Sequence, residues 1–218
     1  IHTRPCQTTY SAEERKKYQD GYWALAAHFK WALNQVFHFP TSGTVALQQE
    51  LSKISSQIKR VIIVEEDLDI AVDFYEYFAS TSHLLDTDDS LLAVSAWNDN
   101  GQERNVRDNT FIYRSDFFPG LGWMLTSQIW SELEPKWPKG YWDDWLREPS
   151  QRKNRHILHP EVSRTLHYGS HGVSNGQYQG DFMSKIRLND VDTKFRELDL
   201  SYLEKANWDR FYTTQVKQ

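Results

Sequence analysis

"RVIIVEEDLDIA", residues 60–71, runs from four β-branched residues directly into a cluster of acids. The apolar run is typical of a short buried strand, and the acids follow where that strand ends. Carboxylates repel one another and resist desolvation, so this cluster needs a partner or a solvated edge. Two interpretations fit the pattern. The acids could begin a helix, where they suit its positive N-terminal dipole, or they could bind a divalent cation.

The chain around this stretch has the composition of a globular protein that can form one domain. It has 218 residues, of which 39% are hydrophobic and 25% charged, and its formal net charge is −5. This charge offers no basic surface, so we expect no nucleic acid partner. No apolar run approaches the roughly 20 residues that span a bilayer, so we expect no membrane segment in this chain. Cys6 is the only cysteine, which excludes an intrachain disulfide.

The alternation of predicted helices and strands in the first half indicates an α/β fold with a mostly parallel sheet. Predicted helices cover residues 11–37, a segment from Asp69 or Asp73 to Phe78, and residues 127–133, 142–147 and 198–212. The last of these contains a capping box at Ser201 and Glu204. Predicted strands lie at residues 60–64 and 91–97 and within residues 110–125, 156–169 and 184–189. Residues 41–59, rich in serine and glutamine, are interpreted as a surface insertion.

A second acidic cluster lies in "YWDDWLREP", residues 141–149, where Asp143 and Asp144 stand between two tryptophans. Aromatic neighbours remove water from a carboxyl group and raise its pKa, which suits a general base. Acids are equally typical of the first turn of a helix. Adjacent helical residues point about 100° apart, so at most one of the two can face a given ligand.

Histidine and glycine patterns give weaker signals. His156 with His159, and His167 with His171, have spacings found in zinc sites. On a strand, however, an i, i+3 pair points to opposite faces, which favours surface or hydrogen-bonding histidines. The glycine-rich segment at 169–180 lacks the P-loop lysine, and both a mobile lid and an ordinary loop fit it.

Six stretches occur in one order that resembles glycosyltransferase family 13. They are "VIIVEEDLDIAVDFYEYF", "VSAWNDNG", "YRSDFFPGLGW", "ELEPKWPK", "YWDDWLREPSQRK" and "LDLSYL", and the resemblance covers roughly residues 18–212. It implies a GT-A-like fold: a Rossmann-like, mostly parallel sheet flanked by helices. On this resemblance residues 1–218 are a single, N-terminally truncated domain, with a donor and metal-binding half at 1–100 and an acceptor and catalytic half at 101–218.

The activity implied by the resemblance is an inverting transfer of GlcNAc from UDP-GlcNAc, dependent on Mn²⁺. The implied acceptor is the α-1,3-linked mannose of a Man5GlcNAc2 N-glycan on a glycoprotein, and the new linkage is β-1,2. The family's location implies the Golgi lumen, as part of a type II membrane protein whose anchor and uracil-binding strands are expected upstream of residue 1. A branch of the family that modifies O-linked mannose shares several of these stretches and stays an alternative.

The first acidic cluster matches the family's metal motif, usually written Glu-Asp-Asp. On that match Asp67 would bind Mn²⁺, Glu66 would lie near the ribose, and Glu65 would hold hydroxyl groups of GlcNAc. Glu66 replaces the middle Asp of the motif. The family also usually carries cysteine where this chain has Ala93 and His156.

The remaining site residues are implied by the same match. Asp143 matches the catalytic base, and Trp142 and Leu121 would lie beside the donor sugar. Ser174 matches a contact to the diphosphate, and His28 matches a residue on the nucleotide side. Two readings compete with the transferase: an inactive homologue or carbohydrate-binding module, and a metal-dependent hydrolase that uses water as acceptor.

Overall fold

The computed structural model describes residues 12–38, 50, 53–54, 56–170, 173, 180 and 182–216. The described α-helices are α1 (Ala12–Phe37), α3 (Phe74–Thr81), α4 (Leu84–Thr87), α5 (Ser127–Leu133), α6 (Trp142–Arg147), α7 (Pro149–Arg152) and α8 (Lys205–Phe211). The described strands are β1 (Arg60–Ile63), β2 (Leu68–Ile70), β3 (Leu91–Ser95), β4 (Ile112–Ser115), β5 (Trp123–Thr126), β6 (His156–Pro160) and β7 (Thr165–His167). Cys6 lies outside the described residues, and so does most of the predicted insertion at 41–59.

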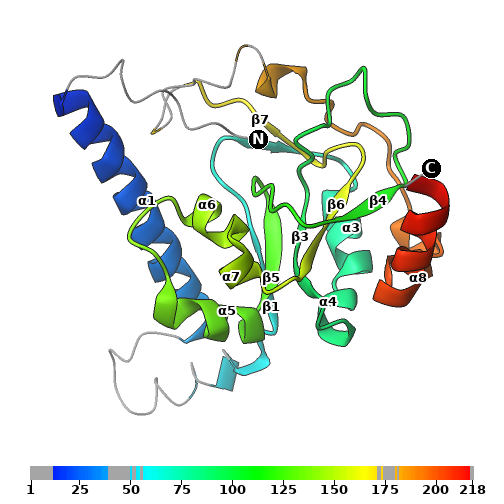
Figure 1. The fold of residues 1–218 in the computed structure, drawn as a ribbon, viewed down its shortest axis with the longest axis horizontal. Coiled ribbons are helices and arrows are strands. Elements are labelled where there is room, and N and C mark those ends of the chain that lie inside the picture. Colours follow the sequence, from blue (N-terminus) through cyan, green and yellow to red (C-terminus); the bar gives the residue numbers. More distant parts are fainter. Residues whose placement is uncertain are drawn as a thin grey trace.

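Five strands form one mixed sheet in the order β1-β5-β3-β6-β4 (Figure 1). The predicted α/β class is confirmed, and β1, β3 and β6 run in the same direction. The sheet is mixed in its pairing: within it β3 and β6 pair in parallel, and the other neighbouring strands pair antiparallel. β4 leads to β5 through the Pro-Gly loop at residues 116–122. Both of these strands run opposite to β1, β3 and β6, and β5 lies between β1 and β3.

Helices cover both faces of this sheet, with α1, α5 and α6 on one side and α3, α4 and α8 on the other (Figure 1). Alternate residues of β5 enter opposite cores: Trp123 and Leu125 pack with α1 and α6, and Met124 packs with α3. This alternation follows from the two-residue repeat of a strand. Both cores combine residues from before and after residue 100. At the edge of the sheet β1 is only half-buried, although its sequence is apolar on both faces.

Helix α1 confirms the predicted helix and carries most of the predicted core stripe. Ala26, Phe29 and Leu33 are buried, whereas Tyr22 and Val36 are half-buried. Two contacts attach this helix to the segment that leads into α6. The Tyr22 ring stacks on Tyr141 at 4.5 Å, and the Trp137 indole donates a hydrogen bond to the Ala26 carbonyl at 2.9 Å. The position of α6 therefore depends on α1. No helix in the described part of the chain is both long and apolar enough to cross a membrane.

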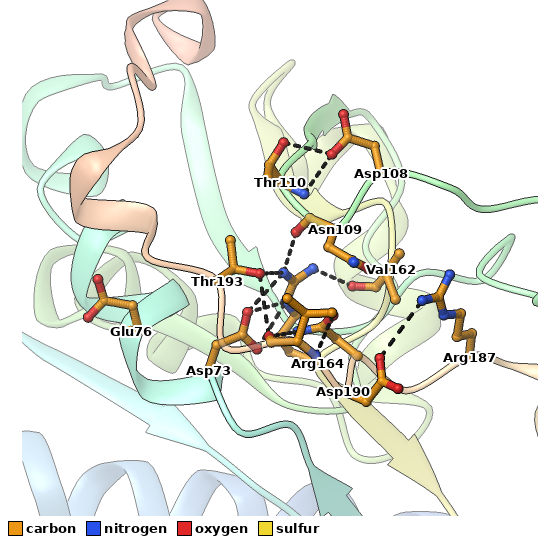
Figure 2. A network of polar contacts seen from close by, with 12 residues as sticks. Asp73, Glu76, Asp108, Asn109, Thr110, Val162, Arg164, Arg187, Asp190 and Thr193 are labelled. Carbon is orange, nitrogen blue, oxygen red and sulfur yellow. Dashed lines mark hydrogen bonds and ion pairs between the residues drawn. The ribbon is translucent and has the colours of Figure 1, made fainter.

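A buried ion pair joins Arg164 to Asp73, and neither side chain is exposed to solvent (Figure 2). Arg164 Nη2 lies 3.0 Å from Asp73 Oδ2, and the guanidinium also donates to the carbonyls of Val162 and Asn109. Asp73 is the N-cap residue of α3 but makes no side-chain bond to that helix, because its carboxylate receives Arg164 instead. Asp73 thereby confirms one of the two predicted starts of this helix, and Asp69 lies on β2.

The backbone of Arg164 also connects three segments. Its N–H donates to the Ala96 carbonyl just after β3, at 2.7 Å, and its carbonyl accepts from the Ala71 N–H, at 2.9 Å. Ala71 follows β2 directly, and Arg164 precedes β7 directly. The two-stranded antiparallel ribbon of β2 and β7 is therefore fixed at its base to the end of the main sheet.

Two predicted features of the C-terminal part are wrong. Residues 184–189 do not form a strand: Met183–Lys185 is a 3₁₀ helix, and single bridges then join Ile186 to Gln102 and Leu188 to Ser163. The segment crosses two different parts of the chain, so neither partner runs alongside it for a ladder to form. The predicted capping box is also absent, because Ser201 opens a separate 3₁₀ helix and α8 begins only at Lys205.

The Arg164–Asp73 pair should dominate the stability of this region. Asp73→Ala leaves a buried guanidinium without its counter-charge, so the free energy of unfolding should fall by about 3–5 kcal/mol. Asp190→Ala is the matched control, because it removes a carboxylate that lies 3.8 Å from Arg187 and is 83% exposed. Urea denaturation followed by circular dichroism measures both changes. Equal effects of the two substitutions would contradict this role of the buried pair.

Candidate active site

The acids at 65–67 do not begin a helix. They form the turn between β1 and β2, and α3 begins only at Phe74. The helix-dipole interpretation is therefore wrong, and the carboxylates at this turn have no helix N-terminus to neutralise them. Glu65 and Asp67 are half-buried and Glu66 is exposed.

Residues 167–169 hold this acidic turn from the neighbouring strand. Leu68 pairs with His167 across the ribbon, and the Tyr168 N–H donates to the Asp67 carbonyl at 3.1 Å. The Tyr168 hydroxyl donates to the Glu66 carbonyl at 2.8 Å. The backbone of the acidic turn is thus fixed by two hydrogen bonds from one tyrosine.

The Asp67 carboxylate lies in a fixed place between His167 and Gly169. Its Oδ2 is 2.9 Å from His167 Nε2. A β-carbon on Gly169 would lie only 2.2 Å from the same oxygen, far inside van der Waals contact. The glycine therefore leaves the space that the carboxylate fills. The side chain of Asp67 is still 30% exposed, so a ligand can reach it.

Glu65 interacts electrostatically with acids of both predicted acidic clusters. Burial, followed by the negative charges of Asp67, Glu66 and Asp143, raises the pKa of Glu65 to about 7. A carboxylate interacts this way only with charges that are close, so Asp143 on α6 lies near the acidic turn. The two clusters are far apart in the sequence, and the fold places them at one site.

Arg147 forms ion pairs with the two acids of α6. Its Nη1 lies 2.9 Å from Asp144 Oδ1 and 3.3 Å from Asp143 Oδ2. The guanidinium is itself held by a bond from Nε to the Phe118 carbonyl, at 2.9 Å, and by the Phe117 ring. Asp144 thus has the closer contact to Arg147, whereas Asp143 also interacts with Glu65. Of the two acids, Asp143 is the one whose charge contributes to the raised pKa of Glu65.

Trp142 packs α6 against the core. Its indole is only 5% exposed and stacks on Trp123 at 5.5 Å and on Trp137 at 5.8 Å. Phe29 of α1 completes the contact, with ring centroids 4.4 Å apart. The ring is therefore part of the core, and it fixes the backbone from which Asp143 projects.

The other predicted site residues differ in how firmly they are tied to this region. Leu121 has a positive φ of 51°, and its carbonyl accepts a hydrogen bond from the Thr165 hydroxyl at 2.6 Å. It therefore lies against the first residue of β7. His28 is exposed on α1, where its ring stacks on Trp31 at 5.6 Å. Ser174 lies outside the described residues.

Four residues of this site were not predicted from the sequence: Arg147, His167, Tyr168 and Gly169. The pattern analysis grouped His167 with His171, but its partner is Asp67, which is remote in the sequence. Arg147 follows Asp143 by four residues on α6, so helical spacing is a signal that could have identified it.

The donor atoms at the turn fit a cation that takes most of its ligands from a substrate. Within the described ranges no group of three or more His, Cys, Asp or Glu side chains could hold a metal alone. Mg²⁺ and similar ions typically bind one or two protein carboxylates and complete the shell with substrate phosphates and water. Burial and then the neighbouring negative charges raise the pKa of Glu65, and a positive charge here would offset the second of these causes. The Asp67 side chain is 30% exposed, so such an ion can reach it.

Sequence comparisons with known proteins identify the family of this chain. A sequence model of the GNT-I family matches residues 6–218. Over 205 residues, 94% of this chain, the sequence is 43% identical to a protein of Arabidopsis thaliana, the alpha-1,3-mannosyl-glycoprotein 2-beta-N-acetylglucosaminyltransferase. The aligned region covers 43% of that protein, so the chain spans less than half the length of this relative.

Gly169 provides a test of the geometry at Asp67. Gly169→Ala places a methyl group where the carboxylate lies and should break the contact between Asp67 and His167. NMR of the histidine ring nitrogens should report a changed His167 signal in an otherwise folded protein. Gly180→Ala is the control, because a β-carbon there meets nothing within 4 Å. An unchanged His167 signal in Gly169→Ala would show that the carboxylate is not held as described.

Proposed function

Because the chain belongs to the GNT-I family, we propose that it carries donor-binding and catalytic residues of an N-acetylglucosaminyltransferase. The proposed donor is UDP-GlcNAc, the cofactor Mn²⁺, and the acceptor a mannose of a high-mannose N-glycan on a glycoprotein. The proposed fold type is GT-A and the proposed location the Golgi lumen. The printed name of the Arabidopsis relative supports the transferred sugar and the type of acceptor.

The proposal is carried by the Asp67 carboxylate, which lies 2.9 Å from His167 and is 30% exposed, together with Asp143, whose charge contributes to the raised pKa of Glu65 in the acidic turn. An inverting transfer needs a base on one side of the anomeric carbon and a leaving-group site on the other. Asp143 stands on α6 and Asp67 on the ribbon, so separate elements supply the two groups. A carbohydrate-binding module would need neither a base nor a cation site.

Asp143 is proposed to act as the base. Its carboxylate accepts the proton of the acceptor hydroxyl while that oxygen attacks the anomeric carbon and the bond to UDP breaks. Arg147 contacts this carboxylate at 3.3 Å and can hold its orientation as the proton arrives. Trp142 fixes the helix behind it through stacking in the core. The base is therefore mounted on a rigid element, as general-base catalysis requires.

The acidic turn is proposed to bind the donor. Asp67 would hold Mn²⁺, which supplies positive charge to the departing diphosphate when it is bound. Glu66 would lie near the ribose, and its backbone carbonyl accepts a hydrogen bond from the Tyr168 hydroxyl. Glu65 would hold hydroxyl groups of GlcNAc.

Four further residues are proposed to contact the donor on the evidence of the family match. Leu121 and Trp142 would lie beside the sugar, Ser174 at the diphosphate and His28 on the nucleotide side. The contact of Leu121 with β7 supports the first of these proposals. Trp142 is buried, so it would act mainly through the position of its backbone.

Removal of the Asp67 carboxylate tests the cation site. Asp67→Ala should abolish the Mn²⁺-dependent part of UDP-GlcNAc binding, because the remaining acids are less well placed to bind the ion. Asp69→Ala is the control, since Asp69 is an exposed acid two residues further along the chain, on β2. Isothermal titration calorimetry with and without Mn²⁺ measures the difference. Full Mn²⁺-dependent affinity in Asp67→Ala would refute the assignment.

Asp143→Asn tests the base while keeping the shape of the side chain. Turnover should fall by about 10²-fold or more, and donor binding should survive. Asp144→Asn, in the same turn of α6, should have a much smaller effect on turnover. The assay measures GlcNAc transfer to a Man5GlcNAc2 acceptor together with UDP release, which separates transfer from hydrolysis. A larger loss in Asp144→Asn, with the fold intact, would reverse the assignment of the two acids.

A further inference from the structure

We infer that His167 is a second protein ligand of the cation that Asp67 binds, so that the site offers one carboxylate oxygen and one imidazole nitrogen. This inference rests on the proposed function, because it concerns the cation that accompanies the nucleotide–sugar donor. It assigns the site a nitrogen ligand in addition to the oxygens of carboxylate, diphosphate and water.

The distance between the two side chains carries the inference. Asp67 Oδ2 and His167 Nε2 lie 2.9 Å apart. Adjacent ligands of an octahedral ion with bonds of about 2.1 Å are separated by about 3.0 Å. The pair therefore already has the spacing of two neighbouring ligands. In the structure they form a hydrogen bond, and with a cation bound the imidazole carries its hydrogen on Nδ1 and presents the lone pair of Nε2.

The backbone around the pair is fixed, so the spacing does not depend on mobile side chains alone. His167 lies on β7 opposite Leu68 of β2, and the Tyr168 N–H donates to the Asp67 carbonyl. Gly169 closes the other side, because a larger residue there would displace the carboxylate. The side chain of Asp67 is 30% exposed and that of His167 is 16% exposed, so solvent reaches both without unfolding of the ribbon. A preorganised pair of this kind loses little conformational entropy when an ion binds.

The nitrogen ligand has a consequence for ion selectivity. Carboxylate, carbonyl and water oxygens suit Mg²⁺, Ca²⁺ and Mn²⁺ alike, whereas imidazole favours transition metals. A site with one imidazole should therefore prefer Mn²⁺ to Mg²⁺. A carboxylate alone gives little basis for this choice.

Pulsed EPR of bound Mn²⁺ tests the inference without a measurement of activity. The protein is labelled with ¹⁵N in histidine only and combined with Mn²⁺ and UDP, whose own nitrogens stay ¹⁴N. We expect a ¹⁵N coupling typical of a coordinated imidazole, which is lost in His167→Ala. We also expect Mn²⁺ affinity in that variant to fall by about tenfold or more. His83→Ala is the control, because His83 is exposed at the start of α4 and should leave both readouts unchanged.

Each outcome separates this inference from the proposed function. If Mn²⁺ binds with UDP in a manner that needs Asp67 but shows no histidine coupling, the inference is overturned and the proposed function stands. If Mn²⁺ does not bind with UDP at all, the proposed cofactor fails, and the inference fails with it. The wild-type spectrum decides the first question even if His167→Ala does not fold. A coupling that persists in folded His167→Ala assigns the ligand to another histidine and also overturns the inference.

Discussion

The buried ion pair between Arg164 and Asp73 is the constraint on which the arrangement of the site depends. A guanidinium and a carboxylate without solvent exposure are tolerated only when each is paired and its remaining hydrogen-bonding groups are satisfied. Arg164 meets this condition with the carbonyls of Val162 and Asn109 and with the Phe195 ring, 4.9 Å from its guanidinium carbon. The segments that supply these groups must therefore converge at one point. That point is the base of the β2–β7 ribbon, and the acidic turn with Asp67 directly precedes β2 at the other end of this ribbon.

On the other side of the site, the packing of aromatic rings fixes the position of α6, as the ion pair fixes the ribbon. Trp142 is held among Phe29, Trp123 and Trp137, so α6 has one position against α1 and the sheet. The acids of the turn and Asp143 consequently approach one another although their mutual repulsion opposes this. Burial, followed by this repulsion, raises the pKa of Glu65 to about 7. Such an unfavourable arrangement of acids is typical of functional sites, where a positively charged ligand offsets the repulsion.

The sequence was a good guide to elements with a clear local pattern. The bounds predicted for α5 and α6 agree with the structure, and the buried strand at 91–97 is present as β3. The direction of β5 could not be read from the sequence, because strand order depends on contacts between distant residues. The partnership of Asp67 with His167 depends on register across the ribbon, and the space for it depends on Gly169. The family resemblance implies Asp67 and Asp143 as site residues, and this stays a prediction, whereas the ring of Trp142, implied as a contact of the sugar, is buried in the core.

The central claim is that the acidic turn and α6 form the two sides of one donor site. The most direct test is a crystal structure of the protein with Mn²⁺ and UDP-GlcNAc, with the ion located by its anomalous scattering. The account predicts a single Mn²⁺ peak beside Asp67, with the diphosphate on the ion and the anomeric carbon of GlcNAc between the ion and Asp143. A Mn²⁺ peak away from Asp67, or a donor whose anomeric carbon is remote from Asp143, would contradict it.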